Sequence, residues 1–396
     1  MLIKSLIDLD FYKLTMAQVV LLKFPNVKVK YEFKCRTSNA KLGLCASEIR
    51  EEINKLKNLQ LTDEEYKYLQ TIPFLKFEFI NWLKRFKFNP QEEIFIDIFG
   101  ESLQLSIQTS WLQGILYETM ILGIIENIAS RIQMGFDSKI VREEGLINLH
   151  NQIELIKDLN DPQFKFADFG TRRRLSFEWQ DEVVNEFNKT FNIILKTNNF
   201  VGTSNVYLAM KHGIKPVGTM AHEMLMGAQA LFPIPNFQND MFNVWADVYD
   251  GNLGIALTDT ISSEYFFKTF GLKLSKLFDG VRHDSGDPIK FAKMTINHYK
   301  SLGIDPMTKT IVFSDGLTVE DAISIYNIFK NQIKMSFGIG TSLTHNFKSI
   351  KPVSIVIKLQ EVNGFPVVKI SDEPKKAMCP DDKFLEFMKN YFNKGD

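Results

Sequence analysis

Alternating apolar and polar positions mark both ends of the chain. Over residues 27–34 every second side chain is apolar and its neighbours are charged, which predicts a strand with one buried face. A similar alternation returns over residues 354–360, and Asn363-Gly364 then offers a hairpin turn into a further strand over 365–370. Both ends are therefore predicted to be rich in β-sheet.

The middle of the chain has a different pattern, in which predicted strands and helices alternate. From about Phe164 onward, short apolar runs end in polar, glycine-containing loops and are followed by amphipathic helical patterns. Two of these helices carry start signals, Asp287 before Pro288 and Thr318 with Asp321. The predicted strands cover residues 164–166, 215–218, 254–258, 277–282, 310–313 and 335–339. Repeated βα units favour an α/β fold with a closed or nearly closed parallel barrel, whose site lies at the carboxyl ends of the strands.

Length and composition limit what else the chain can be. Its 396 residues, 45% of them hydrophobic, exceed one small core and predict two packed regions. Lys plus Arg equals Asp plus Glu at 47 each, which argues against nucleic acid or a membrane surface as a partner. The most apolar segment, 111–129, is interrupted by Gln113, Glu118 and Glu126 and is predicted to be a buried helix. Three widely spaced cysteines and an N-terminus unlike a signal peptide favour a reducing, cytoplasmic location.

The loops that follow the predicted strands combine glycines, hydroxyls, arginines and aspartates. At successive barrel positions such loops suit a polyphosphate ligand accompanied by Mg²⁺. An ordinary tight turn is the alternative for any one of them, and only their combination favours a phosphate site. The residues predicted to hold phosphate in the two latest loops are Ser314, Asp315, Gly316, Gly340 and Thr341.

Charged residues in the same loops suggest specific roles. Arg172, Arg173 and Arg174 follow one strand and predict an anion clamp, with a solvated helix start as the alternative. Asp259 and Asp284 are not explained by helix capping, so they are candidates for binding ribose hydroxyls or hydrated Mg²⁺. Magnesium would be held mainly through phosphates, with Asp284 as a candidate ligand.

His222 lies near a predicted helix start and could have a structural or a nucleophilic role. A lone histidine there is more often structural than nucleophilic, and the adjacent Glu223 points away from it on a helix. The residues alone leave its role open.

The loop sequences, taken in order, resemble one family. Phe-Gly-Thr-Arg-Arg-Arg from residue 169, Gly-Thr-Met-Ala-His-Glu from 218, Arg-His-Asp-Ser-Gly-Asp-Pro from 282 and Phe-Gly-Ile-Gly-Thr from 337 are similar to the nicotinate phosphoribosyltransferases. Asp-Phe-Tyr-Lys-Leu-Thr-Met from residue 10 extends the resemblance toward the N-terminus. The resemblance implies a type II phosphoribosyltransferase fold, an irregular (β/α) barrel over 116–345 and a second α/β domain over 1–115 completed by 346–396.

The resemblance also implies an activity. Nicotinate would be joined to phosphoribosyl pyrophosphate, giving nicotinate mononucleotide and pyrophosphate in NAD salvage, with ATP as co-substrate and Mg²⁺ as cofactor. His222 matches the histidine that family members phosphorylate when they couple the reaction to ATP hydrolysis. Arg172 and Arg282 would hold the nicotinate carboxylate and the phosphates, and Asp284 would stabilise positive charge at the ribose C1.

The family further implies a homodimer with shared active sites. Tyr12 would then stack on a pyridine ring bound over Phe169 of the partner subunit. Ser204 matches a position where related nicotinamide phosphoribosyltransferases carry aspartate, and a neutral serine favours the acid over the amide.

Two other functions remain open, a nicotinamide-specific phosphoribosyltransferase and a non-catalytic relative that binds nucleotides. One departure concerns the phosphate loop, where relatives often carry an aspartate and this chain has His345-Asn346.

Overall fold

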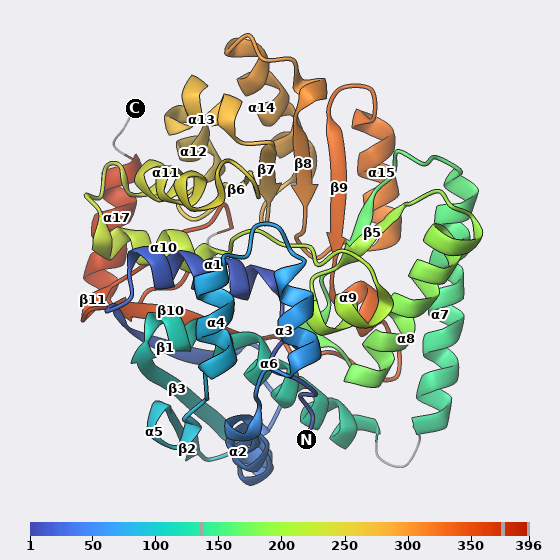
Figure 1. Cartoon of the computed structure of the whole chain (residues 1–396), viewed down its shortest axis with the longest axis vertical. Coiled ribbons are helices and arrows are strands. Elements are labelled where there is room, and N and C mark those ends of the chain that lie inside the picture. Colours follow the sequence, from blue (N-terminus) through green and yellow to red (C-terminus); the bar gives the residue numbers. More distant parts are fainter. Residues whose placement is uncertain (135–137, 374–376, 394–396) are drawn as a thin grey trace.

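The computed structural model describes residues 1–134, 138–373 and 377–393, and the strands among them form two sheets (Figure 1). An antiparallel sheet lies at the lower left of the view and a parallel sheet at its upper centre. Helices α1 (Phe11–Lys23) and α10 (His222–Leu231) lie between them in this view. Both sheets mix with helices, so the fold class is α/β.

The antiparallel sheet joins the two ends of the chain. Its strand order is β11-β10-β1-β3-β2. β1 pairs with β10, for example through Phe33 and Ile357, and both side chains are buried. The predicted alternation at both ends is confirmed. The strands are β1 (Lys28–Cys35), β2 (Ile94–Phe99), β3 (Ser102–Ser110), β10 (Ile355–Val362) and β11 (Phe365–Pro366).

The late hairpin is confirmed, but its second strand is shorter than predicted. Asn363 and Gly364 adopt φ of 50° and 79°, the left-handed conformation that a tight two-residue turn requires. The strand ends at Pro366, because proline has no N–H to donate to a neighbouring strand. Lys369, inside the predicted strand, pairs instead with Met378.

The parallel sheet carries the predicted βα units. Its order is β5-β4-β9-β8-β7-β6, and each neighbouring pair is parallel, so the carboxyl ends of all six strands meet at one edge. The strands are β4 (Phe166–Asp168), β5 (Phe200–Thr203), β6 (Ile255–Leu257), β7 (Gly280–His283), β8 (Thr310–Phe313) and β9 (Lys334–Ile339). Phe337 stacks on Phe313 with ring centroids 5.6 Å apart, which is part of the core beneath that edge.

Helices cover this sheet, and their predicted start signals are confirmed. Thr318 and Asp321 form a complete capping box, and the Asp287 carboxylate accepts from the backbone of Ile289 at 2.7 Å. The helices are α7 (Ser138–Leu159), α8 (Phe177–Phe187), α9 (Val206–His212), α14 (Pro288–Ser301) and α15 (Val319–Phe329). In Figure 1, α14 and α15 lie beside β7, β8 and β9.

One predicted strand, over residues 215–218, is wrong, and another, over 277–282, begins later than predicted. Residues 215–218 make only an isolated bridge from Pro216 to Thr203, since proline cannot donate to a ladder. Residues 272–277 form helix α13 (Leu272–Leu277), and β7 begins only at Gly280. A Cβ on Gly280 would lie 1.9 Å from the Thr310 carbonyl oxygen, so the strand needs glycine where it meets β8.

The apolar segment in the first half forms the central helix α6 (Trp111–Met134), as predicted. Glu126 within it is fully buried. Among the residues that the structure describes, no helix is long and apolar enough to cross a membrane. The other α-helices are α2 (Ala46–Asn54), α3 (Asp63–Gln70), α4 (Phe77–Arg85), α5 (Pro90–Glu93), α11 (Phe237–Tyr249), α12 (Ser263–Thr269), α16 (Thr341–Thr344) and α17 (Asp382–Asn393).

Candidate functional site

One pocket lies at the carboxyl edge of the parallel sheet and is closed on its other side by α1, α6 and β10. Arg172, His222, Asp284 and Gly340, which come from four separate βα loops, all line it. The other predicted site residues on its wall are Tyr12, Phe169, Ser204, Arg282, Ser314, Gly316 and Thr341.

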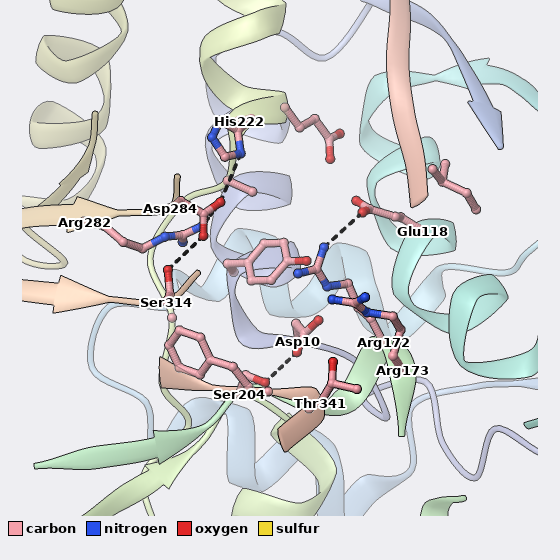
Figure 2. A pocket seen from close by; sticks show the side chains of 18 of the residues that line it. Asp10, Glu118, Arg172, Arg173, Ser204, His222, Arg282, Asp284, Ser314 and Thr341 are labelled. Carbon is pink, nitrogen blue, oxygen red and sulfur yellow. Dashed lines mark hydrogen bonds and ion pairs between the residues drawn. The ribbon is translucent and has the colours of Figure 1, made fainter. Parts of the chain in front are cut away.

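Charged side chains stand on two sides of the pocket (Figure 2). His222, Arg282, Asp284 and Ser314 stand on one side, and Glu118, Arg172 and Arg173 on the other. Asp10, Ser204 and Thr341 lie between them at the base of the view. Each side of the pocket therefore offers both a carboxylate and at least one guanidinium group, and the imidazole lies on the side of Asp284.

His222 begins α10 and is held by Asp259. Its Nε2 lies 2.8 Å from Asp259 Oδ1, while Nδ1 lies 3.6 Å from Asp284 Oδ2. Burial and the nearby Lys369 ammonium lower the pKa of His222 to about 4, although the two carboxylates oppose the shift. A neutral imidazole that donates its Nε2 proton to Asp259 keeps a lone pair on Nδ1.

Asp259 does not line the pocket, so its predicted contact with ribose or magnesium stays a prediction. It is fully buried behind His222 and also accepts from Ser285 Oγ at 2.6 Å, with Lys369 Nζ 3.0 Å away. Its oxygens are thus already occupied by protein partners, and it orients His222. Asp315 is likewise absent from the pocket wall, although Ser314 and Gly316 on either side of it are present.

Asp284 presents a carboxylate to the pocket. It accepts from Ser314 Oγ at 2.8 Å and lies 3.5 Å from Arg282 Nη2. Burial alone would raise its pKa, but the Arg282 guanidinium and His222 outweigh burial and lower the pKa to about 2. Asp284 is therefore ionised at neutral pH.

The three consecutive arginines split between two roles. Arg172 and Arg173 line the pocket, and Arg172 Nη1 lies 3.8 Å from Glu118 Oε1. Arg174 is buried and binds both oxygens of Asp8 at 2.7 and 2.8 Å. The predicted clamp of three is thus wrong for Arg174, because its backbone turn directs the guanidinium into a buried ion pair that ties the N-terminal segment to this loop.

The two aromatic residues lie in the pocket of one chain. Phe169 packs against Gly338, where an added Cβ would come within 2.4 Å of its ring. Tyr12 belongs to α1 of the same chain and lines the same cavity. The family resemblance implies that Tyr12 reaches across to a partner subunit, and this stays a prediction beside its position in the pocket of its own chain.

Ser204 is already engaged by an acid. Its Oγ donates to Asp10 Oδ1 at 2.5 Å, and the Phe11 N–H donates to the Ser204 carbonyl oxygen at 2.7 Å. Burial raises the pKa of Asp10, even though Arg172 opposes the shift. The corner around Ser204 therefore already contains one carboxyl group.

Sequence reasoning missed four charged residues of the pocket wall: Asp10, Glu118, Glu223 and Lys358. Asp10 stands two positions before Tyr12 in the N-terminal motif, and Glu118 interrupts an apolar helix, so both carried a signal. Lys358 looked like the wet face of an alternating strand, and only the pairing of the chain ends places it beside the βα loops.

His345 and Asn346, which the sequence analysis singled out, follow the loop predicted to hold phosphate. The His345 ring is buried, with Nδ1 3.1 Å from the Arg173 carbonyl oxygen and 3.4 Å from Glu126 Oε1. His345 therefore lies behind Arg173, outside the residues that line the pocket.

Fold and site together define an α/β protein with an anion-binding pocket at the carboxyl edge of a parallel sheet, which is typical of enzymes acting on phosphorylated substrates. Models of two parts of one family match the chain. The nicotinate phosphoribosyltransferase (NAPRTase) family matches residues 164–396, and the NAPRTase N-terminal domain matches residues 7–126. The chain belongs to the nicotinate phosphoribosyltransferase family, which confirms the resemblance of its loops.

Individual relatives agree over the full length. Nicotinate phosphoribosyltransferase 2 of Pseudomonas aeruginosa is 42% identical over 396 residues, covering 99% of this chain and 97% of the relative. Nicotinate phosphoribosyltransferase 1 of the same organism is 40% identical over 397 residues, with coverage of 99% and 97%. The crystal structure of the Vibrio cholerae nicotinate phosphoribosyltransferase matches with a TM-score of 0.91 at 39% identity, covering 99% of this chain and 94% of that one.

Proposed function

We propose that this protein transfers the phosphoribosyl group of phosphoribosyl pyrophosphate to nicotinate, forming nicotinate mononucleotide and pyrophosphate in NAD salvage. Membership of the family over nearly the whole chain supports the reaction. The observation that carries the proposal is the convergence of Arg172, His222, Asp284 and Gly340 on one cavity beside two aromatic rings.

The pocket residues suit each part of the reaction. A flat pyridine ring fits between Tyr12 and Phe169, and Arg172 supplies paired N–H donors for the nicotinate carboxylate. The ring nitrogen attacks the ribose C1, the C1–N bond forms, and the C1–O bond to pyrophosphate breaks. The Asp284 carboxylate would stabilise positive charge at C1, while the arginines attract the departing anion.

Magnesium fits this pocket through one carboxylate. Among the described residues, His222, Asp259 and Asp284 form a group with ligand atoms close enough to share an ion. Asp259 is already saturated by protein donors, which leaves Asp284 as the ligand beside phosphate oxygens and water. Bound Mg²⁺ would neutralise part of the diphosphate charge.

ATP coupling through His222 is also part of the proposal. With Nε2 held by Asp259, the Nδ1 lone pair is the available nucleophile. Nδ1 would attack the γ-phosphorus of ATP, forming an N–P bond as the P–O bond to ADP breaks. Asp259 supplies the orienting partner that such a nucleophile requires.

Base choice separates this proposal from its nearest rival, a nicotinamide-specific enzyme. Ser204 is neutral, and a second carboxylate beside Asp10 would crowd negative charge around the nicotinate carboxylate. The test supplies purified protein with phosphoribosyl pyrophosphate, Mg²⁺ and either base, with and without ATP. Formation of nicotinate mononucleotide supports the proposal. Turnover of nicotinamide alone would support the rival, and binding without turnover of either base would indicate a non-catalytic relative.

Fold and assembly extend the proposal. We propose that the six parallel strands form the wall of an irregular barrel, with residues 1–115 and 346–396 as the second domain. A homodimer and a cytoplasmic location remain predictions from the family and the composition. Tyr12 and Phe169 of one chain both line the pocket, and the predicted sharing of the site between subunits is part of this proposal.

A further inference from the structure

Lys358 is a cation of the pocket wall that the reaction described above does not use. It lies on β10, in the sheet built from the two chain ends, and its side chain is partly buried. The ammonium forms no hydrogen bond or ion pair with any residue that the structure describes. Glu32, which lies opposite Lys358 on β1, is paired with Lys30 at 3.0 Å.

The nearest acid cannot satisfy Lys358 on its own. Glu118 is the main negative neighbour of Lys358, but its Oε2 already binds the fully buried Lys13 at 2.5 Å. Its Oε1 faces Arg172 at 3.8 Å. Glu118 therefore faces Lys13, Arg172 and Lys358, although Lys13 also binds Glu223 at 2.7 Å. A partly buried cation without a partner is costly unless a ligand supplies negative charge.

The neighbours of Lys358 indicate which end of the substrate it faces. Arg172 and Asp284 lie within electrostatic reach of its ammonium. Asp284 is the carboxylate assigned to the ribose C1, and the diphosphate is the group attached there. We assign the 5-phosphate to the loop of Gly340 and Thr341, which the sequence predicts to hold phosphate. A compact ammonium suits a phosphoryl oxygen, since it acts as a point charge.

We propose that Lys358 binds a phosphoryl oxygen of the diphosphate in phosphoribosyl pyrophosphate and retains it in the pyrophosphate product, an inference that rests on the proposed function. Burial lowers the pKa of Lys358 to about 8, although Glu118 opposes the shift, so the amine is mostly charged at pH 7. The N-terminal and C-terminal segments would thus provide a positive wall opposite the βα loops.

The substitution Lys358→Met tests this inference, with Lys358→Arg as a rescue and Lys34→Met as a control. Lys34 is an exposed lysine on β1, which pairs with β10, and it does not line the pocket. For Lys358→Met we expect the KM for phosphoribosyl pyrophosphate and the inhibition constant of pyrophosphate to rise about tenfold or more. The KM values for nicotinate and ATP should stay within about twofold, a split that a merely structural lysine would not produce. Lys358→Arg should restore most of the lost affinity, and Lys34→Met should behave as wild type.

Direct calorimetric titration with magnesium pyrophosphate, without nicotinate or ATP, separates binding from turnover. Weaker binding by Lys358→Met supports the inference. Equal binding by wild type and Lys358→Met, or a rise confined to the KM for ATP, would overturn it. These results are distinct from failure of the proposed function, in which the wild-type protein itself would form no nicotinate mononucleotide.

Discussion

At the scale of single residues, His222 is set apart by the two carboxylates that face its two ring nitrogens. Asp259 binds Nε2 at 2.8 Å from a fully buried position, and Asp284 lies 3.6 Å from Nδ1 on the pocket side. The first contact fixes the ring and the second leaves one nitrogen accessible. This asymmetry is what favours a nucleophile over a structural histidine.

Replacing His222 by alanine should separate the two activities. We expect His222→Ala to abolish stimulation by ATP while some uncoupled nicotinate mononucleotide formation persists, because the arginines and Asp284 remain in place. Product formation is measured with and without ATP. His212→Ala is the control, since His212 pairs with Asp181 outside the pocket and should keep full stimulation. Equal loss of both activities would indicate a structural role for His222.

The pH dependence of the ATP step follows from the same geometry. Because burial and Lys369 lower the pKa of His222 to about 4, the imidazole is neutral and nucleophilic well below its ordinary titration range. Labelling of the protein by γ-phosphate-labelled ATP, measured as an initial rate, should therefore not fall between about pH 7 and pH 5.5 because of His222 protonation. A falling limb centred near pH 6.5 in the labelling rate of the wild-type protein would contradict this account.

Single residues also show where sequence reasoning reaches its limit. Arg172 and Asp284 were predicted as site residues because they stand in loops after strands, and His222 and Ser204 because of the family resemblance. All four line the pocket. Asp10 was missed, since its role depends on the hydrogen bond from Ser204, a residue 194 positions away. Contacts of this kind leave no periodic pattern in the sequence.

At the scale of secondary-structure elements, buried polar contacts join segments that hydrophobic patterns cannot align. The loop after β4 illustrates this. Arg172 and Arg173 face the pocket, whereas Arg174 binds Asp8 with both side chains almost completely buried. Three consecutive arginines thus have two different roles, and the helical turn over Thr171–Arg173 directs their side chains to different places.

The Arg174 ion pair should be important for stability. Arg174→Met leaves a buried carboxylate without its partner, so the free energy of unfolding should fall by about 3 kcal/mol or more in urea titrations. Arg142→Met, which breaks an exposed pair with Glu182, should cost less than about 1 kcal/mol. Equal effects of the two substitutions would show that burial does not strengthen the pair.

The same pair also predicts how stability depends on pH. Burial alone would raise the pKa of Asp8, but Arg174 outweighs it and holds the pKa below its ordinary value. The pair's contribution is therefore present above the unfolded pKa and is lost as the pH falls through the folded one. Arg174→Met should accordingly lose less stability on acidification than the wild-type protein.

The glycine behind Phe169 should control binding of the base. A Cβ at Gly338 would come within 2.4 Å of the Phe169 ring, so Gly338→Ala should displace that ring. We expect the KM for nicotinate to rise about fivefold or more and the KM for phosphoribosyl pyrophosphate to change less. Gly271→Ala is the control, since nothing lies within 4 Å of its added Cβ. An unchanged nicotinate KM would exclude Phe169 from the base site.

At the scale of the whole molecule, the site is made where the two sheets meet. Repeated βα units predicted that their loops converge at one edge, and the structure shows this for Arg172, His222, Asp284 and Gly340. The opposite wall, which includes Glu118 and Lys358, could not be predicted. It forms only when β1, near the start of the chain, pairs with β10, near its end. Pairing across more than 300 residues depends on packing of whole faces, which a local pattern does not encode.

The most direct measurement is a crystal structure of the protein with nicotinate mononucleotide bound. The account predicts the pyridine ring between Tyr12 and Phe169 of the same chain, its carboxylate at Arg172, and the ribose C1 near Asp284. A pyridine ring bound outside this pocket, or a bound nucleotide that contacts neither Arg172 nor Asp284, would contradict the account.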